Sequence, residues 1–272
     1  MNGRTMTVSG RDGLIVLTIN GRPVEVREGA TLLEAARTAG VHIPTLCHHP
    51  GMTPRAVCRM CLVKVNAEAR PQPACSTPAR DGDAVETEGA ELQALRKADA
   101  AWMLAHHPND CMRCEVDGSR QLQRLVNENQ WKPAVEKVPA GSPEPFGPQP
   151  SDHTSPSIWR DLDKCIECGL CADVCGEAGQ QQYVIGFAER GSDRLPVTAF
   201  DQPLSETGCI SCGQCTRVCP VGALSSARTT MGQVHSGLVE AALRLGIRHR
   251  MVGPYNKENF RLQQDEDQRS VA

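Results

Sequence analysis

Two cysteine groups in the second half of the chain constrain its fold more than any other feature. The runs CIECGLCADVC and CISCGQCTRVCP each space four cysteines as CxxCxxCxxxC. In this arrangement three thiolates hold one [4Fe-4S] cube, and the fourth reaches across to a neighbouring cube. The spacing therefore predicts two cubes that exchange the last cysteine of each run. The expected ligand sets are Cys165, Cys168, Cys171 and Cys219 for one cube and Cys209, Cys212, Cys215 and Cys175 for the other.

Zinc is the alternative metal for these two runs. A zinc site needs two CxxC pairs around one tetrahedral ion, which gives no reason for a third and fourth cysteine in each run. This half also resembles the two-cluster bacterial ferredoxins. It departs from them at Gly176, where a proline often follows the first run, and in the 33 residues that separate the runs. These departures indicate an inserted loop and not a loss of ligands.

The cysteine content also indicates the compartment. The chain has 14 cysteines in 272 residues, and most fall in tight groups, unlike the scattered spacing of a disulfide framework. Because metals need free thiols, we expect a reducing, cytoplasmic location. The start MNGRTMTVSGRDG has no apolar core and no cleavage-like site, so we expect no export. No apolar run approaches the roughly 18 residues that cross a bilayer, so we expect no membrane span.

Composition and motifs argue against several function classes. The net charge is −3, and the aromatic residues are only four Phe, three Trp and two Tyr. A stacking surface for single-stranded nucleic acid would therefore have few members, and we expect no nucleic-acid partner. The chain lacks the GxGxxG, GxxxxGK(S/T) and GxSxG motifs. We therefore expect neither a nucleotide site nor catalytic residues in this chain.

The first half of the chain predicts a small α+β domain. Asn20 and Gly21 form a turn signal between two strand candidates, which indicates a hairpin. Thr31 and Glu34 have the spacing of a capping box at the start of an apolar helix, which Gly40 ends. The expected order of elements suits a helix packed on a mixed sheet. The strands are expected over residues 14–19, 24–27, 62–65 and 84–86.

This domain carries four cysteines of its own. The gaps between them are ten, two and thirteen residues. Four thiolates suit a [2Fe-2S] cluster, although the plant-type ferredoxins have four residues in the first gap. Spacing alone leaves a zinc site open as an alternative. The cysteines are Cys47, Cys58, Cys61 and Cys75.

A family resemblance decides in favour of iron. The stretch IPTLCHHPGMTPRAVCRMCLVKV resembles the N-terminal [2Fe-2S] segment of the large iron-sulfur subunit of respiratory NADH dehydrogenase. Iron-only hydrogenases, diaphorase subunits of NAD-reducing hydrogenases and NAD-dependent formate dehydrogenases carry the same segment. The resemblance covers about residues 14–228. It implies a β-grasp ferredoxin fold for the first domain, followed by the two-cluster ferredoxin domain.

The resemblance and the sequence pattern together suggest a division of the chain. Apolar residues at helical spacing predict helices over 90–105 and 121–131. A proline-rich stretch without apolar periodicity reads as a connector. The expected parts are a [2Fe-2S] domain over 1–88, a helical segment over 89–131, the connector over 132–157, a two-cube domain over 158–228, and a partner-docking helix with a disordered tail over 229–272.

A third cysteine group departs from the family pattern. HPNDCMRCEVDGSRQLQ resembles the motif in which one histidine and three cysteines bind a further [4Fe-4S] cube. His107, Cys111 and Cys114 match three ligands, but Arg120 occupies the fourth position. A guanidinium stays protonated and has no lone pair to offer iron, so the sequence favours loss of this cube. Its retention would need an alternative ligand: Glu115, Asp117, a side chain of a partner or an exogenous molecule.

The resemblance implies an electron-transfer subunit. Iron-sulfur clusters exchange single electrons, and a chain with several of them and no substrate motif is expected to relay electrons. The expected partners are a flavin-containing NAD(H)-oxidoreductase subunit and a separate catalytic subunit of the hydrogenase or formate dehydrogenase type. The formate dehydrogenase type is considered because SARTTMGQVHS resembles the passage into its molybdopterin domain. Two alternatives are an independent soluble ferredoxin and a zinc-stabilised interaction module without redox function.

Overall fold

The computed structural model describes residues 13–66, 68, 70–108, 114, 120–131, 151–189 and 194–227. The described residues between 13 and 227 belong to one compact unit. The expected docking helix and tail over 229–272, and most of the expected connector, lie outside the described residues. Within the described ranges, no helix is long and apolar enough to span a membrane.

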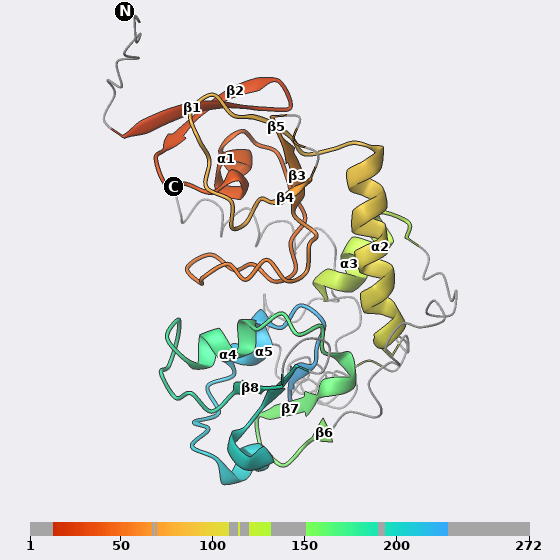
Figure 1. Cartoon of the computed structure of the whole chain (residues 1–272). Helices are drawn as coiled ribbons and strands as arrows, with labels where there is room; N and C mark the ends of the chain where they lie inside the picture. Colours follow the sequence, from red (N-terminus) through yellow and green to blue (C-terminus); the bar gives the residue numbers. More distant parts are fainter. Residues whose placement is uncertain are drawn as a thin grey trace, which may run out of the picture. The chain divides into compact units, whose positions relative to one another are not determined.

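The first part of the chain forms a five-stranded sheet with the strand order β2-β1-β5-β3-β4 (Figure 1). Strands β1 and β5 pair in parallel, and the other neighbours are antiparallel. The two-residue strand β4 had no counterpart among the expected strands. The bounds are β1 (Leu14–Ile19), β2 (Arg22–Arg27), β3 (Leu62–Val65), β4 (Gln72–Pro73) and β5 (Ala84–Glu86).

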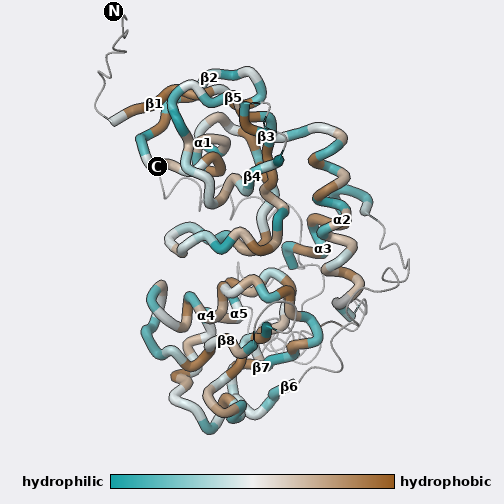
Figure 2. Tube along the Cα trace, in the orientation of Figure 1, coloured by the Kyte–Doolittle hydropathy of each residue, from teal (hydrophilic) through white to brown (hydrophobic). Residues whose placement is uncertain are grey.

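Local sequence signals account for the hairpin and for the helix α1 (Leu32–Thr38). Asn20 and Gly21 both have positive φ, 51° and 77°, as a two-residue turn between twisted strands requires. Thr31 and Glu34 form the expected capping box at the start of α1. Apolar residues of α1 pack with those of β1 and β3, which Figure 2 shows as hydrophobic stretches. The α+β prediction for this domain is confirmed.

Two helices follow the sheet. Helix α2 (Ala90–His106) is tied to the sheet by Arg96, which is buried and donates to the carbonyl oxygens of Leu62 and Thr87 at 2.8 and 2.9 Å. Helix α3 (Gln121–Glu128) is shorter than expected, because Gln130 takes a left-handed conformation with φ 53°. Residues 129–131 therefore leave the helix.

Over the described residues 151–189 and 194–227, the chain forms two small sheets, two short α-helices and short 3-10 helices (Figure 1). Strand β7 lies between β6 and β10, and both pairings are antiparallel. Strand β6 lies inside the stretch expected to be a connector. The hairpin β8-β9 lies in the expected inserted loop between the two cysteine runs. The bounds are β6 (Ser151–Asp152), β7 (Ile158–Asp161), α4 (Leu170–Cys175), β8 (Gly186–Ala188), β9 (Leu195–Val197), α5 (Gln214–Val218) and β10 (Leu224–Ser226).

Candidate metal centres

The strand pair β3-β4 positions two cysteines of the first group. Cys61 directly precedes β3, and Cys75 comes two residues after β4. The amide of Ala74 donates to the carbonyl oxygen of Cys61 at 3.0 Å, which continues the ladder toward both cysteines. Both cysteines are almost fully buried, and the interaction with the Cys75 side chain, together with burial, raises the pKa of Cys61.

The loop before β3 brings the other two cysteines of this group together. The amide of Cys58 donates to the Sγ atom of Cys47 at 3.4 Å. Ala56 and Arg59 flank this turn with φ 53° and 55°, a left-handed conformation that side chains rarely adopt. A hydrogen bond with the Cys58 side chain lowers the pKa of Cys47 to about 6, although burial opposes the shift. Charge interactions of Cys75 with Cys47 and Cys58 link the two pairs, so the four cysteines expected for the [2Fe-2S] cluster lie near one another.

The two cysteine runs of the second half share one local backbone geometry. Glu167 and Gly169 have φ of 56° and 85°, and the equivalent Ser211 and Gly213 have φ of 55° and 73°. In each run the glycine then precedes a short helix, α4 in the first and α5 in the second. In the first run, the left-handed turn directs the amide of Glu167 to the Sγ atom of Cys165 at 3.3 Å. The repeat indicates that both runs are built for the same kind of ligand.

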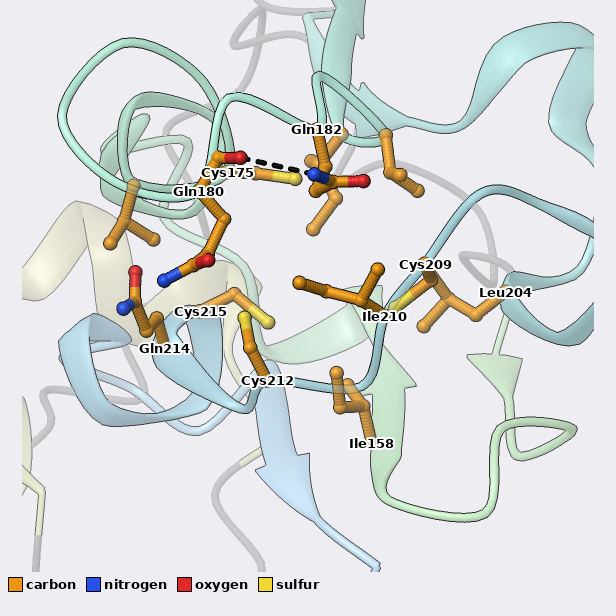
Figure 3. A pocket seen from close by; sticks show the side chains of 13 residues that line it. Ile158, Cys175, Gln180, Gln182, Leu204, Cys209, Ile210, Cys212, Gln214 and Cys215 are labelled. Carbon is orange, nitrogen blue, oxygen red and sulfur yellow. Dashed lines mark hydrogen bonds between the residues drawn. The ribbon is translucent and has the colours of Figure 1, made fainter.

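Each expected set of four cysteines lines one cavity. The first cavity is bounded mainly by apolar side chains, among them Ile158, Leu204 and Ile210 (Figure 3). The second has similar apolar walls, including Leu162 and Val221. The cysteines are Cys175, Cys209, Cys212 and Cys215 in the first cavity and Cys165, Cys168, Cys171 and Cys219 in the second. Each cavity therefore combines three cysteines of one run with the last cysteine of the other.

The chemistry of these donors suits an iron-sulfur cluster. Burial raises the pKa of Cys165 and of Cys215 to about 12, and it raises the pKa of Cys171 as well. The thiols therefore stay protonated unless strong positive charge comes within bonding distance, as cluster iron does. Four cysteine thiolates are the usual ligands of a [4Fe-4S] cube, and each cavity presents four cysteines among apolar side chains. The donor set of the two cavities therefore fits cubes.

The three cysteine sets lie in series. Cys47 of the first set interacts electrostatically with Cys168 of the second. Cys171 of the second set interacts in the same way with Cys215 of the third. Cys212 of the third set is exposed, whereas Cys168, Cys171 and Cys215 are buried. The series therefore runs from the set expected to hold the [2Fe-2S] cluster, through the set that contains Cys168, to the set that contains the exposed Cys212.

An ion pair joins the loop of the first set to helix α4. Arg55 donates through Nε to an oxygen of Asp173 at 2.8 Å and through a second nitrogen to the other oxygen. A planar guanidinium and a carboxylate paired in this way are held in a defined orientation. Gly169 leaves room for this pair, because a Cβ atom there would lie 2.8 Å from the Arg55 Nε atom. The sequence carries no signal for this contact, since the partners are more than a hundred residues apart.

The third cysteine group is only partly described. His107 is half-buried at the end of α2, and its Nδ1 atom lies 2.9 Å from the carbonyl oxygen of Pro108. Burial lowers the pKa of His107, while hydrogen bonds to Pro108 and Val221 oppose the shift. Cys114 is half-buried, and Cys111 lies outside the described residues, as do the alternative ligands at 115 and 117. The Nη1 atom of Arg120 donates to the carbonyl oxygen of Cys219 at 3.0 Å.

Two family comparisons match the two cysteine-bearing parts of the chain. Residues 13–90 match a family described as "2Fe-2S iron-sulfur cluster binding domain". Residues 164–223 match a family described as "4Fe-4S dicluster domain". The predicted cofactors, one [2Fe-2S] cluster and two [4Fe-4S] clusters, are confirmed at the level of these domains.

One relative is similar over nearly its whole length. The gamma subunit of the NAD-reducing hydrogenase HoxS of Cupriavidus necator is 30% identical over 215 residues, which cover 79% of this chain and 88% of the relative. The chain belongs to the iron-sulfur electron-transfer subunit family of HoxS gamma. A chain in the crystal structure of an NAD⁺-reducing [NiFe]-hydrogenase in its H2-reduced state agrees, with a TM-score of 0.68, 30% identity, and coverage of 78% of this chain and 87% of that chain.

The HoxS gamma family extends to parts of longer proteins. An NADH-quinone oxidoreductase subunit of Rhizobium meliloti is 36% identical over 213 residues, and the NADP-reducing hydrogenase subunit HndD of Solidesulfovibrio fructosivorans is 34% identical over 216 residues. The matches cover 78% of this chain but only 24% and 36% of these two relatives. The chain thus spans about a quarter to a third of their length. The predicted resemblance to these classes of protein is confirmed.

Proposed function

We propose that this chain relays electrons between a flavin-containing NAD(H)-oxidoreductase subunit and a separate catalytic subunit of the hydrogenase or formate dehydrogenase type. The observation that carries the proposal is the series of three cysteine sets, which begins at the buried Cys47 and Cys58 and ends at the exposed Cys212. When bound, iron-sulfur clusters supply one-electron transfer without proton or bond chemistry. The family of HoxS gamma supports an assignment as one subunit of such a complex.

We assign the twelve cysteines of the three sets as the cluster ligands. Most of these cysteines are buried in apolar surroundings, and the ion pair of Arg55 with Asp173 holds the first set against the second. Because electron transfer between clusters needs them close together, this ion pair is a positioning contact in the proposal. The ligands are Cys47, Cys58, Cys61 and Cys75 for [2Fe-2S], Cys165, Cys168, Cys171 and Cys219 for one cube, and Cys175, Cys209, Cys212 and Cys215 for the other.

Anaerobic purification of the tagged chain, expressed together with its neighbouring genes, tests the proposal. We expect a flavoprotein to co-purify at a fixed ratio, and NADH to bleach the visible absorption of the complex. The chain separated from the flavoprotein should be reduced by dithionite but not by NADH, because it has no expected nucleotide site. A solitary monomer that passes electrons equally well between unrelated enzymes would favour an independent ferredoxin instead.

A further inference from the structure

Arg120 stands where the family pattern has the last ligand of a further cube, and the structure gives it a different set of contacts. Its Nη1 atom donates to the carbonyl oxygen of Cys219 at 3.0 Å. Its Nε atom is buried and has no hydrogen-bond partner in the described part of the chain. The guanidinium therefore lies against the backbone of a proposed cube ligand.

The backbone around Arg120 holds this position. Arg120 is the N-cap residue of α3, with an extended backbone conformation. Two residues later, the amide of Leu122 donates to the carbonyl oxygen of Pro220 at 3.3 Å. Leu122 is 3% exposed and belongs to the same apolar core as Cys219. Both ends of the segment 120–122 are thus bonded to residues 219–220, which leaves the guanidinium little freedom to turn away.

Arg120 is a half-buried cation with sulfur neighbours. Burial lowers the pKa of its guanidinium, while the charges of Cys219 and Cys114 oppose the shift. A guanidinium nevertheless stays protonated in proteins. Among the residues that the structure describes, no carboxylate forms an ion pair with Arg120. Its charge therefore acts mainly on the sulfurs beside it.

The two cube cavities differ in the cations around them. In the set that contains Cys219, Cys165 also interacts with the cation Arg194. The largest charge interactions of Cys215, in the other set, are all with cysteines. Positive charge stabilises the more negative, reduced state of a cluster, and local charge is one of the factors that set its reduction potential.

We propose that Arg120 raises the reduction potential of the cube held by Cys165, Cys168, Cys171 and Cys219. The inference rests on the proposed function. One electron leaves the [2Fe-2S] cluster, which is oxidised, and enters this cube, which is reduced; Arg120 gains and loses no proton. The residue acts as a fixed positive charge, and because of it an electron occupies this cube in preference to the [2Fe-2S] cluster. The arginine that replaces the fourth ligand of the third cysteine group thus changes the reduction potential of a neighbouring cluster.

A potentiometric titration of the anaerobically purified full chain, followed by electron paramagnetic resonance, tests this proposal. We expect Arg120→Gln to lower the equilibrium constant for reduction of one cube about tenfold, which is ~59 mV for one electron. Arg120→Lys keeps the positive charge, so the reduction potential of this cube should stay close to that of the unmodified chain. The matched control is Arg124→Gln, which removes a partly exposed cation one turn further along α3 and should leave all potentials unchanged.

The outcomes separate this inference from the proposed function. Unchanged potentials in Arg120→Gln, at an iron content equal to that of the unmodified chain, would overturn the tuning role. An equal shift of the reduction potential in the glutamine and lysine variants would also overturn the tuning role. The loss of the hydrogen bond to Cys219, and not the loss of charge, would then be responsible. Arg120→Met provides a second neutral side chain if the glutamine variant loses iron. An unmodified chain without any cluster signal would overturn the proposed function itself.

Discussion

Replacing Cys61 with alanine is expected to abolish the [2Fe-2S] cluster and to lower the iron content from about ten to about eight atoms per chain. Cys61 is 1% exposed and packs in the apolar core of the first domain together with Cys75. Without it, three thiolates remain, and none of the neighbouring core side chains is a metal donor. Iron and acid-labile sulfide analysis, with the resonance of the reduced protein, measures the loss.

Cys114 provides the matched control for this experiment. We propose that the third cysteine group holds no cube, so Cys114→Ala should keep about ten irons per chain. In the otherwise unmodified chain, Arg120→Cys completes the ligand pattern of His107, Cys111 and Cys114. This variant should gain about four irons. An unchanged [2Fe-2S] signal in the Cys61 variant would contradict the ligand assignment of the first set. A loss of four irons in the Cys114 variant would show that the third cube is present.

Replacing Gly179 with alanine is expected to destabilise the two-cube domain by about 3 kcal/mol, at the upper end of the cost of overpacking. A Cβ atom at this position would overlap the carbonyl oxygen of Val174 and lie 2.6 Å from the side chain of Gln214. Val174 directly precedes the proposed ligand Cys175, so its displacement should also loosen the cube. The temperature at which the visible absorption is lost, at a fixed scan rate, measures the effect.

Gly186 is the control for the Gly179 variant. It lies in β8, and a Cβ atom there would meet nothing within 4 Å. Gly186→Ala should therefore change stability by no more than about 0.5 kcal/mol, as for other surface substitutions. Equal thermal behaviour of the two alanine variants would contradict the packing described around Val174.

Local signals in the sequence predicted the first domain well. The turn at Asn20 and Gly21 and the capping box of Thr31 and Glu34 depend on neighbours within a few residues, and both form as expected. The strands over 62–65 and 84–86 also have the expected bounds. The two-residue strands β4 and β6 were missed, because so short a strand has no periodicity and depends on its partner strand.

Contacts between distant segments could not be predicted in the same way. The ion pair of Arg55 with Asp173 joins two segments that lie 118 residues apart in the sequence. The sequence showed that Arg120 cannot bind iron, but its hydrogen bond to Cys219 depends on the packing of α3. The left-handed conformations of Glu167 and Ser211 carry no sequence signal either, since most residues other than glycine avoid them. The cysteine spacing alone, by contrast, predicted the two sets that line the cavities.

The iron and acid-labile sulfide content of the anaerobically purified chain tests the central claim most directly. One [2Fe-2S] cluster and two [4Fe-4S] clusters predict about ten iron atoms and about ten sulfides per chain. The protein should be brown and should give resonance signals after reduction with dithionite. A colourless chain that contains zinc and no sulfide would contradict the account.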